Sequence, residues 1–152
     1  MYDKLPKNEM TVVFDETGAD TGLPYKGDFT VKCALTIQGK HAVALEKTRL
    51  MADTANPSGD LAGIALTLSE VRARIISAPE WWTESDNGAN LLDENILLRI
   101  FDKCMNCENA WHRLIKSSAE EAKKAEEKAA ADAIKAQEEA AAEKAKAKAE
   151  GK

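Results

Sequence analysis

The sequence is poor in aromatic residues, has no excess of basic over acidic residues, and lacks long apolar runs. Aromatic residues make up 5% of the chain, and two histidines are present. No apolar run reaches the ~18 residues that a membrane-spanning helix needs. The net charge of -5 lacks the basic excess on which binding to nucleic-acid phosphates depends. We therefore expect neither a membrane nor a nucleic-acid partner.

Cysteine is also scarce, and its count is odd. Three cysteines do not predict a disulfide framework, which is built from pairs in an oxidising compartment. The opening segment MYDKLPKNEM has charged residues and a proline where a signal peptide has its apolar centre. These features predict a cytosolic chain, or one assembled from cytosolic parts.

Glycine and proline are absent between Asp93 and Gly151, which favours a long helix that starts after an Asp93 N-cap. The composition changes within this stretch. Residues 119–152 contain eight lysines and nine acidic residues, with Ile134 as the one large aliphatic residue. Such a segment cannot form its own core, but alanine, glutamate and lysine favour helix. The sequence predicts a compact domain over residues 1–118 and a solvated helical tail over 119–152.

Period-two alternation marks the β structure of the compact domain. Residues 11–14 are a short β-favouring run, and residues 15–27 are rich in loop formers. Residues 28–38 then alternate, which predicts a half-buried strand ending at a turn over 39–40. The apolar positions of that alternation are Phe29, Val31, Cys33, Leu35 and Ile37.

Helical spacing dominates the rest of the compact domain. We predict helices over residues 41–53 and 60–78, the second ended by Pro79, and a third from about residue 94. The predicted fold is α+β, with two or three short N-terminal strands packed on three helices. The last helix continues into the charged, Ala-rich tail.

The segment DKCMNCENAWHR contains a C-x-x-C pair, Cys104 and Cys107, followed by His112. On a helical wheel both cysteines lie in the apolar stripe, whereas His112 lies about 140° from Cys107. We therefore interpret them as buried structural cysteines. A metal site that recruits Cys33 and His41 is the main alternative, and a redox pair is the other.

The segment FDETGADTGL contains an Asp-Thr-Gly triplet at Asp20, as aspartic proteases do. In that family, however, the aspartate follows a hydrophobic strand, and here the apolar run leads into Asp15 instead. Calcium binding by Asp15, Glu16 and Asp20 would lack the EF-hand spacing. We interpret the segment as a connecting loop, and we predict no catalytic residue, no cofactor and no bound metal.

Three apolar side chains are candidates for a protein interface. Trp81 and Trp82 are adjacent, so in an extended chain one fills the core while the other faces outward. Ile134 is the third candidate, because it is isolated in the charged tail.

Residues 68–104 resemble small proteins of tailed bacteriophages, in which a helix is followed by an Ala-Pro-x-Trp-Trp segment, an Asn-Gly turn and a new helix start. The matching residues are Ala78, Pro79, Trp81, Trp82, Asn87, Gly88, Leu92, Asp93 and Asn95. The resemblance covers about a quarter of the chain. Such proteins are encoded among virion-morphogenesis genes, including those for tail-assembly chaperones and minor structural components.

This resemblance implies a non-enzymatic structural or assembly protein, located in the virion or the host cytoplasm. Its partners would be other phage structural proteins or further copies of the chain. Two other hypotheses stay open. One is a soluble binding or regulatory adaptor with a helical spacer tail, and the other is a small zinc-binding protein.

Overall fold

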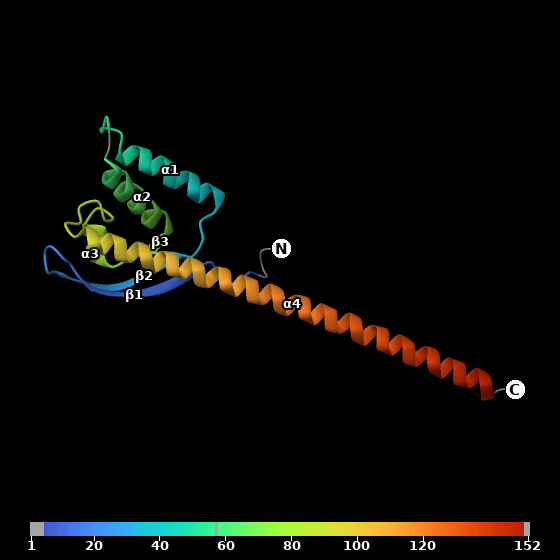
Figure 1. Cartoon of the computed structure of the whole chain (residues 1–152). Coiled ribbons are helices and arrows are strands. Elements are labelled where there is room, and N and C mark those ends of the chain that lie inside the picture. The colour runs from blue at the N-terminus through green and yellow to red at the C-terminus, as the bar shows by residue number, and fades with distance from the viewer. Residues whose placement is uncertain (1–4, 57, 151–152) are drawn as a thin grey trace. The chain divides into compact units, whose positions relative to one another are not determined.

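The computed structural model describes residues 5–56 and 58–150, and Figure 1 shows the order of their elements. A hairpin of two strands comes first, and a short third strand lies between two pairs of helices, so the predicted α+β fold is confirmed. The elements are β1 (Glu9–Thr17), β2 (Pro24–Lys32), α1 (Ile37–Leu50), α2 (Gly59–Arg74), β3 (Ile75–Ser77), α3 (Glu80–Glu84) and α4 (Glu94–Glu150).

The three strands form one antiparallel sheet in the order β1-β2-β3. The β1–β2 hairpin keeps a single register from Glu9↔Lys32 to Thr17↔Pro24. Side chains alternate across it, so Phe14 is 1% exposed while its neighbour Val13 is 69% exposed. The prediction of a loop over residues 15–27 was too long, because both strands extend into it and only residues 18–23 connect them.

The start of α1 corrects two sequence-based expectations. The predicted strand over 28–38 ends at Lys32, and the predicted turn at 39–40 lies inside the helix. The Thr36 hydroxyl accepts a hydrogen bond of 3.0 Å from the Gly39 amide and so caps α1. Because the helix begins there, Ile37 does not continue the apolar side of a strand and is 90% exposed.

The second helix is shorter than predicted. It is capped by Ser58, whose hydroxyl accepts a hydrogen bond of 3.2 Å from the Leu61 amide, and it ends at Arg74. The predicted helix over 60–78 therefore loses its last turn to β3, which pairs with β2. Pairing with β2 therefore decides the conformation of residues 75–77, although their apolar spacing is that of a helix. Isoleucine also favours strands.

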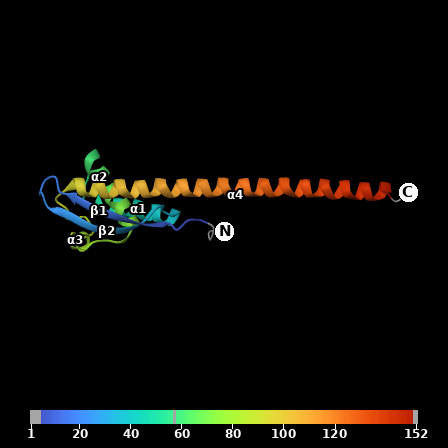
Figure 2. The ribbon, with the colours of Figure 1, turned by 90° about the horizontal axis from the view of Figure 1, so that it is seen from below.

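The core lies between one face of the sheet and the helices α2, α3 and α4. Figure 2 shows the first part of α4 running alongside β1. The sheet contributes two phenylalanines and a tyrosine, and Trp82 of α3 is the largest fully buried side chain. The buried members are Phe14, Tyr25, Phe29, Val31, Cys33, Leu68, Val71, Trp82, Ile96, Leu97, Ile100, Cys104 and Cys107.

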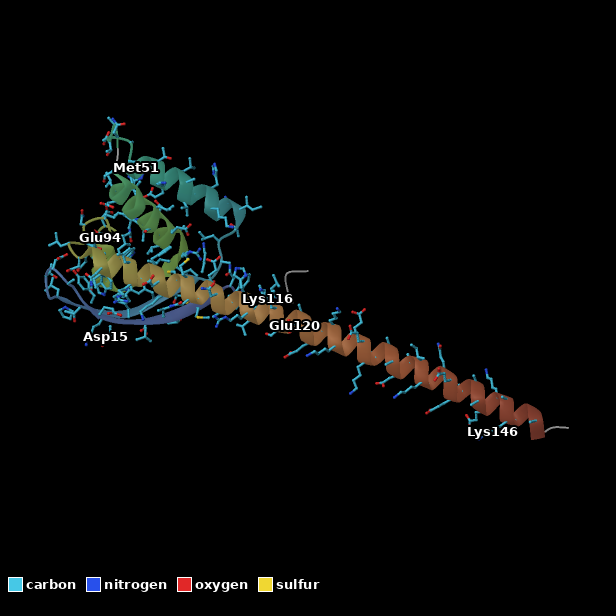
Figure 3. The ribbon with its side chains drawn as sticks, in the orientation of Figure 1. Asp15, Met51, Glu94, Lys116, Glu120 and Lys146 are labelled. Atoms are coloured by element: carbon cyan, nitrogen blue, oxygen red, sulfur yellow. The ribbon has the colours of Figure 1, made fainter. Side chains whose placement is uncertain are left out.

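The chain divides into two units between His112 and Arg113. In the second unit the residues from Lys116 to Ala147 are exposed helix, and Figure 3 shows charged side chains such as Glu120 and Lys146 spread around it. One ion pair in this unit joins Lys123 to Glu127 at 3.9 Å. Among the described residues, no helix is both long and apolar enough to cross a membrane.

Candidate binding groove

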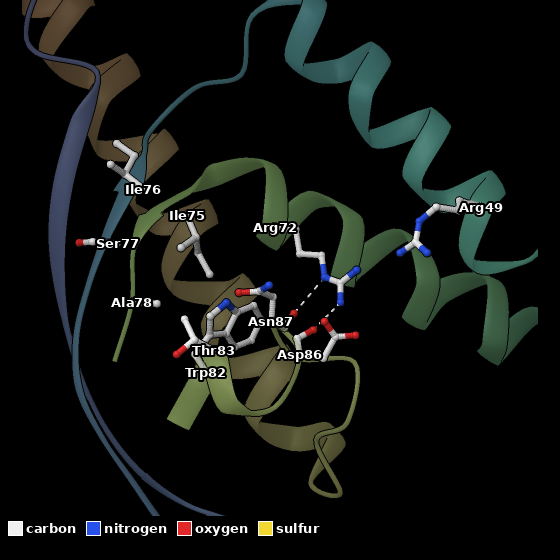
Figure 4. Close-up of a pocket in the computed structure, with 10 residues that line it drawn as sticks. All are labelled: Arg49, Arg72, Ile75, Ile76, Ser77, Ala78, Trp82, Thr83, Asp86 and Asn87. Atoms are coloured by element: carbon white, nitrogen blue, oxygen red, sulfur yellow. Dashed lines mark hydrogen bonds between the residues drawn. The ribbon is translucent and has the colours of Figure 1, made fainter. Parts of the chain in front are cut away.

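A groove of about 710 Å³ lies beside β3 in the first unit (Figure 4). One side is the extended segment from Ile75 to Ala78, and the other is the turn that follows α3. Trp82 and Thr83 also line the groove, and Arg49 of α1 and Arg72 of α2 complete it. Apolar side chains and backbone therefore meet two guanidinium groups in one concave surface.

The strand side of the groove is an open sheet edge. β3 pairs with β2 through Thr30↔Ser77 and Val31↔Ile75, with a register shift between the two pairs. Since β3 is last in the strand order, its other edge carries no neighbouring strand from residues 5–56 or 58–150. Ile76 is 45% exposed on this edge. An edge of this kind offers backbone donors and acceptors to an extended peptide.

Arg72 fixes the opposite side of the groove. Its Nε donates to the Asn87 carbonyl oxygen at 2.9 Å, and its Nη2 donates to the Asp86 carbonyl oxygen at 2.6 Å. Asp86 and Asn87 have φ angles of 53° and 50°, in the left-handed region that few residues other than glycine adopt. The guanidinium therefore holds a strained turn in place against α2.

Glu46 of α1 links the two arginines. Its carboxylate accepts bonds of 2.8 Å from Arg49 and of 2.6 Å from Nη1 of Arg72. The hydrogen bonds from Arg49 lower the pKa of Glu46 most, burial opposes them, and those from Arg72 lower it further, to about 2. Glu46 stays ionised at neutral pH, and Arg49 remains 65% exposed at the groove.

A second polar cluster lies at the start of α4, around the buried carboxylate of Asp93. It accepts hydrogen bonds from the backbone amides of Asp20 and Thr21, at 2.8 and 3.0 Å, and from the Thr21 and Tyr25 hydroxyls. Burial raises the pKa of Asp93, but these hydrogen bonds outweigh burial and bring it to about 2. A side chain at Gly18 would collide with this carboxylate. The cluster therefore ties the β1–β2 loop to α4.

The Asp-Thr-Gly triplet takes part in this cluster as part of the loop that binds the Asp93 carboxylate. The Asp20 residue contributes its backbone amide, and Thr21 contributes its amide and hydroxyl. The expectation of a connecting loop is confirmed for residues 18–23. Asp93 was expected as an N-cap, and the contacts of its side chain with the loop were missed.

A third cluster surrounds Arg74, whose side chain is 5% exposed at the end of α2. Its Nη1 donates to the Cys33 carbonyl oxygen at 2.7 Å, and Nη2 donates to Glu108 at 2.7 Å. Its Nε lies 3.3 Å from Glu70. One guanidinium thus joins the end of β2, helix α2 and helix α4. Sequence reasoning missed Arg74, because it lies at the edge of the apolar stripe of its helix.

Against the larger effect of burial, the Arg74 guanidinium lowers the pKa of all three cysteine thiols. All three are buried, at 0%, 1% and 5% exposure for Cys33, Cys104 and Cys107, which confirms the expected burial. Burial raises the pKa of each thiol, to about 12 for Cys104, although Arg74 acts in the opposite direction. Buried thiols with raised pKa values are poor nucleophiles and poor metal ligands.

Both histidines are exposed, unlike the buried cysteines. His41 is exposed on α1, and His112 is 54% exposed with its Nε2 at 3.6 Å from Glu108. Among the described residues, no group of three or more His, Cys, Asp or Glu side chains is arranged to hold a metal ion.

The two tryptophans occupy different environments. Trp82 is 1% exposed and fills the core, so this conformation leaves it little surface for a partner. Trp81 is half-buried, and its Nε1 donates to the Lys26 carbonyl oxygen at 2.9 Å. Its ring packs edge-on against Tyr25, with the centroids 5.0 Å apart. Ile134, the third predicted interface residue, is 58% exposed in the second unit.

Comparisons with models of known protein families, with curated proteins and with solved structures give no match.

Proposed function

We propose that this protein is a non-enzymatic assembly protein that binds a segment of another protein in the groove beside β3. The observation that carries the proposal is the open edge of β3, which forms one side of a groove of about 710 Å³. A segment bound there would pair with backbone, cover Ile75 and Ile76, and reach the exposed guanidinium of Arg49.

The use of the buried polar groups supports this proposal. Asp93 accepts bonds from a loop and a strand, Arg74 joins three elements, and Arg72 holds a turn. The hydrogen bonds of these three side chains join elements of the fold to one another. The surfaces that the first unit offers to other molecules include its open sheet edges, its exposed apolar side chains and the exposed guanidinium of Arg49.

The resemblance to tailed-phage proteins suggests the setting. Three of the residues that carry it, Ala78, Trp82 and Asn87, line this groove. Two others, Asp93 and Asn95, hold the loop between β1 and β2. We therefore propose a virion or tail protein as the partner. The alternative, a regulatory adaptor, draws on Ile134, which is 58% exposed and gives the tail helix one apolar contact point.

Site-specific photo-crosslinking tests the groove. A photoreactive amino acid at Ile76, on the open edge of β3, should give one discrete cross-linked partner in cells that produce the proteins of the native system. The matched control carries the same group at Ile37, which is 90% exposed on α1 and outside the groove. Arg49→Glu should weaken the cross-link at Ile76.

The identity of the cross-linked partner then separates the hypotheses. A virion or tail protein, found by mass spectrometry, supports the assembly reading, whereas a regulatory protein supports the adaptor reading. Equal cross-linking from Ile76 and Ile37 would overturn the proposal that this groove is the binding site.

A further inference from the structure

The sheet has a second open edge, on β1, and its hydrogen-bond pattern can be assigned. The Cys33 amide donates to the Asn8 carbonyl oxygen at 3.3 Å, and the Gly18 amide donates to that of Leu23 at 2.9 Å. Hydrogen-bonded and non-hydrogen-bonded residue pairs alternate along an antiparallel ladder. The backbone N–H and C=O groups of the even-numbered residues of β1 therefore point toward β2. The backbone groups that point away from β2 belong to Glu9, Thr11, Val13, Asp15 and Thr17.

This edge is long and regular. The register runs through all nine residues of β1 without a shift. At one end, the Thr17 carbonyl oxygen accepts a bond of 3.4 Å from Asn95. Within the described ranges, no hydrogen bond occupies the outward backbone groups of Glu9, Thr11, Val13 and Asp15. Val13, at the centre, is 69% exposed, and it is not one of the charged residues that usually protect an edge.

Helix α4 supplies the chemistry of the adjoining surface. Val12 and Phe14 of β1 and Ile100 and Lys103 of α4 line a narrow gap between strand and helix. The Lys103 ammonium group lies 5.9 Å from the centroid of the Phe14 ring. In the part of the chain that the structure describes, no carboxylate lies within ion-pair distance of Lys103. A strand added to β1 would therefore place its helix-facing side chains beside apolar groups and one free positive charge.

These features favour a single extended segment over a second copy of the chain. In an antiparallel pair of two β1 edges, Glu9 of each copy would lie near Asp15 and Glu16 of the other. A single segment can instead carry one acidic side chain beside Lys103, because Glu9 and Asp15 are already paired with Lys7 and Lys26. Helix α4 packs on the core face of β1 (Figure 2), so the face of an added strand that continues this surface would meet Ile100 and Lys103.

We propose that the β1 edge accepts an extended strand of a partner protein, which carries an acidic side chain flanked by apolar ones on the face turned toward Lys103. The backbone groups from Glu9 to Asp15 supply the pairing, and the Lys103 ammonium selects the acidic side chain. This surface is separate from the groove beside β3, and it does not depend on the function proposed for that groove.

Peptide binding to the full-length chain tests this proposal. The probe is fluorescein-labelled Thr-Val-Thr-Glu-Thr-Val-Thr, and the matched peptide has lysine in place of glutamate. Fluorescence anisotropy should show that the glutamate peptide binds about tenfold more tightly than the lysine peptide. Lys103→Glu should invert this preference, whereas Arg49→Glu, in the other groove, should leave it unchanged.

Backbone pairing is tested separately. Val13→Pro removes an outward amide but no bond to β2, and proline is tolerated on the open side of an edge strand. The variant should keep the circular dichroism spectrum of the wild type and lose peptide binding. In the wild-type protein, hydrogen exchange of the Thr11, Val13 and Asp15 amides should slow when the glutamate peptide is added. This measurement needs no variant, so it does not depend on whether a variant folds.

Three results would overturn the proposal. The first is that the glutamate and lysine peptides bind with equal affinity, both to the wild type and to Lys103→Glu. The second is that saturating glutamate peptide leaves amide exchange at Thr11, Val13 and Asp15 unchanged. The third is a dimer of the free chain in native mass spectrometry that Val13→Pro dissolves, since the edge would then serve a second copy.

Discussion

The phenolic hydroxyl of Tyr25 donates a hydrogen bond of 2.9 Å to the Asp93 carboxylate. Both side chains are buried, and the bond joins β2 to the residue that precedes α4. Because the same carboxylate also accepts bonds from Asp20 and Thr21, one ionised group holds a strand, a loop and the start of a helix.

Tyr25→Phe should lower the free energy of unfolding by about 2 kcal/mol, because a hydrogen bond to a charged acceptor is lost at a buried site. Urea unfolding followed by circular dichroism measures the change. The control is the same substitution in an Asp93→Asn background, where the effect should be smaller. Equal losses in the two backgrounds would show that the hydroxyl does not stabilise the protein through Asp93.

Acid should weaken the fold through Asp93 within a defined pH window. The pKa of this carboxyl is lowered from an ordinary 3.8 to about 2 in the folded protein. Its contribution to stability is therefore complete above an unfolded pKa of about 4, and it is lost as the pH falls toward about 2. Unfolding free energies at a series of pH values should fall less steeply in this window for Asp93→Asn than for the wild type. Parallel pH profiles for the two proteins would contradict this assignment.

Arg74 and Arg49 offer a matched comparison, since each is paired with glutamate. The side chain of Arg74 is 5% exposed and that of Arg49 is 65% exposed. Arg74→Met should cost about 3 kcal/mol, because it leaves Glu108 and the Cys33 carbonyl oxygen without a buried donor. Arg49→Met should cost less than about 1 kcal/mol, as exposed ion pairs contribute little. Thermal unfolding of both variants measures the difference, and similar losses would mean that the Arg74 cluster is not a principal link between β2 and α4.

The three thiols should be unreactive in the folded chain. With the pKa of Cys104 raised to about 12, only about one molecule in ten thousand carries its thiolate at pH 8. A thiol reagent such as DTNB should therefore modify Cys33, Cys104 and Cys107 slowly in buffer and rapidly in urea. Fast modification of a C-x-x-C thiol in buffer would instead support the redox alternative.

The spacing of apolar residues in the sequence predicts which side of a strand or helix is buried. The alternation through Phe29 and Val31 does mark a strand, and the helical wheel places Cys104 and Cys107 on a side that is buried. Both are local patterns, and local patterns record which side of an element meets the core.

What the sequence hides are contacts made across long separations. Residues 75–77 continue the apolar spacing of a helix, and they become a strand because β2 offers them a partner. Arg74 and Asp93 look like an ordinary helix-end arginine and an ordinary cap, and their roles appear once residues 41 and 68 positions away are brought to them. The groove beside β3 depends on the same strand, so it could not be predicted either.

Two glycines should respond in opposite ways to alanine, and the contrast tests the packing around Trp82. Gly88 has a φ of 87°, and a Cβ there would press on the Trp82 ring and on Leu68. Gly88→Ala should therefore destabilise the protein by about 2–4 kcal/mol, from backbone strain together with overpacking. A Cβ on Gly63, inside α2, would meet open space. Gly63→Ala should stabilise the protein by about 0.5–1 kcal/mol, because alanine favours helix and restricts the unfolded chain.

Thermal and urea unfolding of the two alanine variants give both changes on one scale. Because Trp82 lines the groove beside β3 as well as the core, Gly88→Ala should also displace the turn at Asn87 and weaken the cross-link expected from Ile76. Gly63→Ala leaves that groove untouched and should keep the cross-link at the wild-type level. If Gly88→Ala is destabilised but keeps the full cross-link from Ile76, packing around Trp82 does not determine the shape of the groove. The partner would then bind through β3 alone and not through the turn at Asn87.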